Sequence, residues 1–158
     1  RDRIMIRPRA GNFVYSEEEI NQMKADIDLA KNAGAAGVVL GLLTNDNQID
    51  KKNTTALCDY AFPLPVTFHK AIDTIEDPVE GVRTLIRING VTRILTSGGK
   101  PTALEGKETI KLMMTLAKNK ITILVAGKVT NKNIELVALK TGAKEFHGRK
   151  IVGEINPR

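Results

Sequence analysis

The strongest constraint on the fold of this 158-residue chain is the alternation of short apolar segments with longer amphipathic ones. Runs rich in β-branched residues recur at a spacing of roughly 25 to 30 residues, and helical patterns separate them. This order is typical of βα units on a parallel sheet, so the sequence predicts an α/β fold with six such units. The predicted strands cover residues 3–7, 36–41, 64–69, 92–96, 121–125 and 145–147.

Helix boundaries carry their own signals. Ser16 followed by Glu19 forms a capping box, and apolar residues then recur on one face of the predicted helix: Ile20, Met23, Ile27 and Ala30. Asp77 and Pro78 supply an N-cap and a proline at the first helical position of another helix. Helices are therefore predicted to cover a sheet whose strands are buried.

Composition excludes several classes of protein. The formal net charge is +6, but the lysines are scattered and no dense basic stripe with aromatic residues occurs, so nucleic-acid binding is not expected. No apolar run is long enough to cross a bilayer, so no membrane association is expected. The single cysteine, Cys58, cannot form an internal disulfide, which favours a reducing compartment; as a residue it is read as a small buried hydrophobe.

Polar residues follow the predicted strands at their carboxyl ends, where parallel α/β sheets keep their chemistry. Arg7 ends the first strand, His69 ends the third, and Thr96 with Ser97 ends the fourth. Asp73 comes four residues after His69. A structural alternative is that His69 and Asp73 are only a solvated strand end and a helix cap.

Glu145 and His147 lie two apart on the last strand and therefore share one of its faces. If that face points inward, they join Arg7 and His69 in one polar cluster. Buried ions are costly unless paired, so such a cluster favours a ligand site. The alternative is an internal ion pair between Arg7 and Glu145.

Five segments together resemble the CutC family, the so-called copper homeostasis proteins. They are residues 5–13, 37–41, 66–73, 93–98 and 141–147, which read MIRPRAGNF, GVVLG, VTFHKAID, RILTSG and TGAKEFH. The resemblance implies a TIM-type (β/α)8 barrel of which this chain covers the third to eighth strands. It also implies a cytoplasmic, often dimeric protein with a role in copper handling. One barrel-type domain without the first two βα units is the expectation, either as a fragment or as a partial barrel completed by association.

The chain departs from the family pattern at three places. Ala10 stands for a glycine, Lys70 for a more usual arginine, and residues 125–128 read Val-Ala-Gly-Lys where the family has Pro-Gly-Gly-Gly. A backbone phosphate cradle at that turn is therefore in doubt. Lys128 could meet an anion as a point charge or be a solvated loop lysine.

Two hypotheses about function follow. The resemblance implies a copper-binding homeostasis protein, with His69 and His147 as candidate metal ligands, although copper(I) prefers sulfur and the chain offers one cysteine and four methionines without a cluster. The other hypothesis is a barrel enzyme for a small anionic metabolite, in which His69, Glu145 and His147 do acid–base work. Its ligand-binding residues would be Arg7, Arg9, Lys70, Asp73, Thr96, Ser97 and Gly98. A binding module without chemistry remains a third reading.

Overall fold

A computed structural model describes residues 2–148 of the chain, and its core is one six-stranded parallel sheet. The strands neighbour one another in chain order, β1-β2-β3-β4-β5-β6, which is the order of a barrel and not that of a doubly wound sheet. The elements are β1 (Arg3–Met5), α1 (Glu17–Asn32), β2 (Gly37–Leu40), α2 (Lys51–Ala61), β3 (Val66–Phe68), the 3-10 helix η1 (Lys70–Thr74), α3 (Pro78–Ile86), β4 (Val91–Thr96), α4 (Lys107–Ala117), β5 (Thr122–Val125), α5 (Ile134–Thr141) and β6 (Glu145–Phe146).

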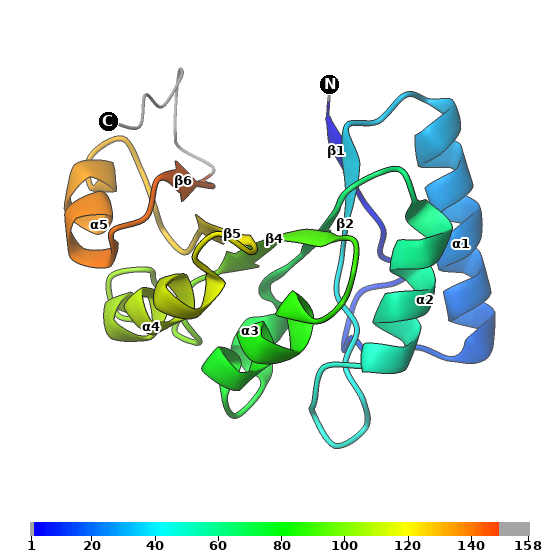
Figure 1. Ribbon diagram of the computed structural model, residues 1–158, viewed down its shortest axis with the longest axis horizontal. Coiled ribbons are helices and arrows are strands. Elements are labelled where there is room, and N and C mark those ends of the chain that lie inside the picture. The colour runs from blue at the N-terminus through cyan, green and yellow to red at the C-terminus, as the bar shows by residue number, and fades with distance from the viewer. Residues whose placement is uncertain (1, 149–158) are drawn as a thin grey trace.

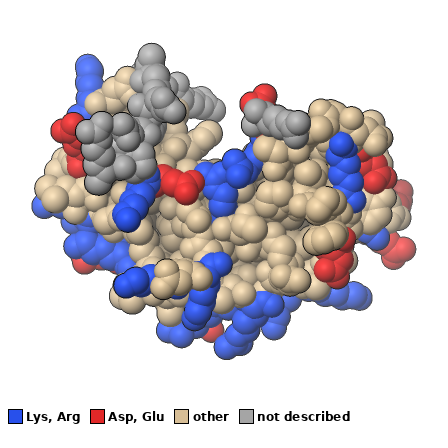
Figure 2. Space-filling model, turned by 45° about the horizontal axis from the view of Figure 1, so that its top comes forward, with Lys and Arg blue, Asp and Glu red and all other residues tan. Residues whose placement is uncertain are grey.

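The predicted α/β class and the six units are confirmed. The sheet curves, and the helices lie along one side of it, in the manner of half a barrel (Figure 1). The other side of the molecule is hollowed, and acidic and basic side chains meet in the hollow (Figure 2). None of the helices within residues 2–148 is long and apolar enough to cross a membrane.

The helix-start signals act as the sequence predicts. The Ser16 hydroxyl accepts from the Glu19 N–H while the Glu19 carboxylate accepts from the Ser16 N–H, which completes the capping box of α1. Asp77 caps α3 with Pro78 at its first turn. The four apolar residues predicted on one face of α1 are all buried: Ile20, Met23, Ile27 and Ala30.

Side chains on β4 alternate between the helix layer and the opposite face. Ile94 and Thr96 are fully buried, and the Thr96 hydroxyl lies 3.7 Å from the Met113 sulfur on α4, so these residues face the helices. Arg93 is one residue removed from Ile94 and therefore faces the other way, toward the side that the helices leave uncovered.

Several strands are shorter than predicted, and the candidate residues lie just beyond them. β1 ends at Met5, two residues before Arg7, and β3 ends at Phe68, directly before His69. His147 follows β6 but still donates its N–H to the Val125 carbonyl. The chain leaves the sheet where polar side chains begin because such groups need water or specific partners.

Candidate functional site

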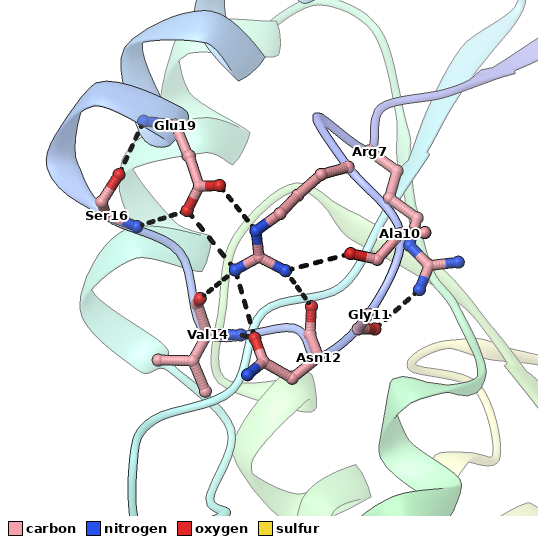
Figure 3. A network of polar contacts seen from close by, with 8 residues as sticks. Arg7, Ala10, Gly11, Asn12, Val14, Ser16 and Glu19 are labelled. Carbon is pink, nitrogen blue, oxygen red and sulfur yellow. Dashed lines mark hydrogen bonds and ion pairs between the residues drawn. The ribbon is translucent and has the colours of Figure 1, made fainter.

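Arg9 organises the loop between β1 and α1 (Figure 3). Its Nε lies 2.6 Å from the Glu19 carboxylate, and its two terminal nitrogens donate to the backbone oxygens of Asn12 and Val14 and to the Asn12 side chain. The guanidinium also stacks over Tyr15, with 4.9 Å from Cζ to the ring centroid. With its donors engaged in this way, Arg9 stabilises the loop, and its expected role in anion binding stays a prediction.

Arg7, in contrast, uses one terminal nitrogen on the Gly11 carbonyl, at 2.9 Å, and the side chain is exposed (Figure 3). Its Cζ lies 4.8 Å from the centroid of Phe13, a cation–π distance. The Phe13 ring in turn lies 5.0 Å from the His69 ring. Arg7 and His69, which the sequence places in one polar cluster, thus both contact the Phe13 ring.

His69 is almost wholly buried, with 5% of its surface exposed. Its Nδ1 accepts the Ala71 N–H at 3.1 Å, which caps η1. Burial, and then the Arg7 charge, lower the pKa of His69 to about 4. The imidazole is therefore neutral at neutral pH, and a role as a proton donor from the charged form is unfavourable.

Asp73 lies on η1 and is surrounded by donors from the loop after β4. Its carboxylate accepts from the Thr96 hydroxyl at 2.5 Å, from the Ser97 N–H and hydroxyl at 2.9 and 3.0 Å, and from the Gly99 N–H at 3.0 Å. The Gly98 N–H donates instead to the Thr96 hydroxyl. These residues, all expected at the ligand site, lie together, but the Thr96, Ser97 and Gly99 donors point at the Asp73 carboxylate.

Glu145 lies elsewhere. Its carboxylate pairs with the Arg93 guanidinium at 2.5 Å, on the face of the sheet that the helices leave uncovered. Among the described residues, no interaction joins Glu145 to Arg7 or His69, so neither the expected polar cluster nor the alternative Arg7–Glu145 pair forms. Arg93 was not among the residues predicted for the site. Its position inside a predicted strand could have pointed to it, because a charged side chain there needs a partner.

A basic pocket lies over the carboxyl ends of β5 and β6, with Lys70 from η1 at its rim. We define it by three side chains: Lys70, Lys128 and His147. Its volume is about 630 Å³, and the lining also includes the backbone turn of Ala126 and Gly127. No carboxylate lines it among the described residues. Lys70 and His147, both predicted site residues, thus line one pocket, and His69 is not part of its lining.

A second hollow, of about 700 Å³, opens near the amino ends of β5 and β6 and includes Lys118 and Glu145 in its lining. We prefer the basic pocket as the candidate site. Ligands of parallel α/β sheets bind outside the carboxyl ends of the strands, where βα loops can vary without disturbing the sheet.

The described residues do not fit copper. Within residues 2–148, no three His, Cys, Asp or Glu side chains come together in a way that could hold a metal ion. Cys58 is buried on α2, and burial raises the pKa of its thiol to about 12, so the thiolate that binds copper(I) is scarce at neutral pH.

The fold and the site define a class: a parallel, barrel-type α/β protein with its candidate ligand site at the carboxyl ends of the strands. The chain belongs to the CutC family, whose sequence model matches residues 2–152.

Named relatives support this assignment. The chain is 46% identical to the mouse copper homeostasis protein cutC homolog over 144 residues, which is 91% of this chain and 53% of that protein. It is 42% identical to the Dictyostelium discoideum homolog, covering 91% of this chain and 60% of that one. The crystal structure of the putative copper homeostasis protein CutC from Streptococcus agalactiae superposes with a TM-score of 0.88 at 38% identity, covering 94% of this chain and 72% of that one. The chain spans a little over half the length of the mouse and human relatives.

Proposed function

We propose that this chain serves in copper homeostasis, as its relatives are named, and that its described part contributes a binding site for a small anion rather than a copper site. Family membership supports the first half of the proposal. The basic pocket supports the second half, because two lysines line this hollow on the strand-end face and no carboxylate among the described residues does.

The chemistry of the basic pocket favours an anion. Lys70 follows β3, while Lys128 and His147 follow the adjacent strands β5 and β6, so three strand ends bring donors to one hollow. Two ammonium groups close together repel each other unless an anion lies between them. Lys128 has φ 54°, next to Gly127 at φ 103°, and a positive φ is uncommon for a residue with a side chain. In this conformation Lys128 lines the pocket.

Thermal shifts with inorganic phosphate, sulfate and malonate test the anion site. At least one should raise the melting temperature of the chain, and both Lys70→Gln and Lys128→Gln should weaken its binding about tenfold, since a hydrogen bond to a charged group contributes roughly 1.5–3 kcal/mol. Lys120→Gln is the matched control, because Lys120 is exposed before β5 and lines none of these hollows. Equal binding by all three variants would refute the pocket.

Copper(I) titration tests the other half. The chain alone should bind copper(I) no more tightly than the micromolar range under anaerobic conditions, because its one thiol is buried and residues 2–148 bring no three ligand side chains together. Copper content and copper tolerance of cells that lack their own family member, with and without the complete gene, test the role in homeostasis. Unchanged copper handling in those cells would contradict that role.

Three further parts of the proposal concern the whole protein. We infer that the six strands belong to a TIM-type (β/α)8 barrel, which the curled parallel sheet and the longer solved relative support. A cytoplasmic location and a homodimer remain predictions from the resemblance. Cell fractionation and light scattering on the complete protein test them.

A further inference from the structure

We propose that His69 is a second ligand contact on the strand-end face: it donates its Nε2–H, as a fixed neutral imidazole, to an oxygen of an oxyanion that Arg7 also binds. Neither residue lines the basic pocket. The contact therefore stands on its own observations.

The tautomer of His69 follows from its backbone contact. The Ala71 N–H points at Nδ1 from 3.1 Å, and a nitrogen that accepts a hydrogen bond carries no proton. The single proton of the neutral ring therefore sits on Nε2. Burial and the neighbouring Arg7 charge lower the pKa of His69 and keep the ring in this neutral form.

The ring is also held in place from several sides. A Cβ on Gly41 would come within 2.4 Å of the His69 Cε1, so Gly41 leaves room that only the imidazole fills. Phe13 packs on the ring at 5.0 Å between centroids, and Phe68 lies at 6.1 Å. A donor whose direction is fixed before the ligand arrives loses little freedom on binding.

Nε2 is the atom left for a ligand. It has no hydrogen-bond partner within residues 2–148, whereas Nδ1 is engaged by the Ala71 N–H, and His69 keeps 5% of its surface exposed. A nearly buried N–H without an acceptor calls for an oxygen from outside the chain.

Arg7 determines the class of that ligand. It stands one aromatic ring away from His69 and spends one of its five N–H donors on Gly11, and its charge also acts on the buried hydroxyl of Tyr15. A guanidinium fork beside a neutral N–H suits a group with two or more oxygens and a negative charge. A carboxylate and a phosphate share this chemistry.

Nitrogen-15 NMR of the imidazoles in the labelled chain tests the proposal first. At pH 7, Nδ1 of His69 should show the shift of an unprotonated nitrogen and Nε2 that of a protonated one. Titration with malonate or with inorganic phosphate should then move the Nε2 signal, and the two probes tell carboxylate from phosphate ligands. A proton on Nδ1, or an unmoved Nε2 at roughly 50 mM of both probes, far above a useful affinity, would overturn the proposal.

Variants provide the second test. His69→Gln keeps a donor near the Nε2 position and should bind the effective probe within about threefold of the parent, whereas His69→Asn keeps only the acceptor for Ala71 and should lose about tenfold, as should Arg7→Met. Lys128→Gln should leave the Nε2 response in place, which separates this contact from the basic pocket. An Nε2 response that Lys128→Gln abolishes and Arg7→Met spares would refute the proposal, and the tautomer measurement needs no variant at all.

Discussion

The Glu145 carboxylate meets the Arg93 guanidinium at 2.5 Å, and the pair links β4 to β6 across the intervening strand β5. Arg93 is 18% exposed in its side chain and Glu145 45%, so this pair is more shielded from water than the pair of Glu108 with Lys111 on α4. It replaces the acid–base partnership with His69 that the sequence suggested. Glu145, expected at the ligand site, thus links two strands through its ion pair with Arg93.

Glu145→Gln should lower the free energy of unfolding by about 1 kcal/mol, because Arg93 keeps a largely buried charge without its anion. Chemical denaturation at low and high salt measures this, and the loss should shrink as salt screens the pair in the parent. Glu108→Gln is the control: Glu108 lies 4.0 Å from Lys111 in a surface ion pair, so this variant should change the free energy of unfolding little. Equal losses in the two variants would show that the Arg93 contact is unimportant.

Acid should destabilise the chain through His69. Its pKa is about 4 in the folded chain and 6.5 for an ordinary imidazole, so the unfolded chain binds more protons between these values and stability falls as pH falls from 6.5 toward 4. Relative to His69→Gln, the parent should lose about 3 kcal/mol over this window and nothing further below it. Denaturation curves at several pH values check this. Parallel pH profiles of the two proteins would contradict the lowered pKa.

Gly41→Ala should cost roughly 2 kcal/mol, because its new methyl would overlap the His69 ring. In a chain that already carries His69→Ala, the same change should cost much less, since the ring is gone. A double-mutant cycle of unfolding free energies measures the coupling. Additive losses would mean that Gly41 matters for a reason other than His69.

Asp73→Ala should destabilise the chain by about 3 kcal/mol and speed amide exchange at Ser97 and Gly99, whose N–H groups would lose their acceptor. Asp73→Asn should lose less free energy of unfolding than Asp73→Ala, because its amide oxygen replaces one of the two carboxylate oxygens as an acceptor. Asp59→Asn, on the exposed face of α2, is the control. Unchanged exchange in the loop would contradict the contact.

Cys58 should be inert toward thiol reagents in the folded chain at pH 8, because its thiol is buried and has a pKa of about 12. The same thiol should react at an ordinary rate once denaturant unfolds the chain. A colorimetric thiol assay with and without denaturant measures both rates. Fast reaction of the folded chain would reopen Cys58 as a metal ligand.

The sequence by itself determined the framework of this protein. The apolar spacing predicts the order of strands and helices, and local signals such as the Ser16–Glu19 capping box and Asp77–Pro78 predict where helices begin. These features depend on residues a few positions apart, so a short segment of the sequence is enough to predict them. The contact of His69 with the Ala71 N–H is equally local, but the alternative of a solvated strand end is wrong, because His69 is buried.

Tertiary structure alone decided which polar groups meet. Arg93 and Glu145 are 52 residues apart, and Asp73 finds its donors 23 to 26 residues further along the chain. A charge that leaves water takes the partner that the strand register brings within reach, and that register depends on the packing of the whole sheet. For this reason Arg9 stabilises the loop between β1 and α1, and Glu145 pairs with Arg93 on another strand. The side chains that share one pocket are Lys70, Lys128 and His147.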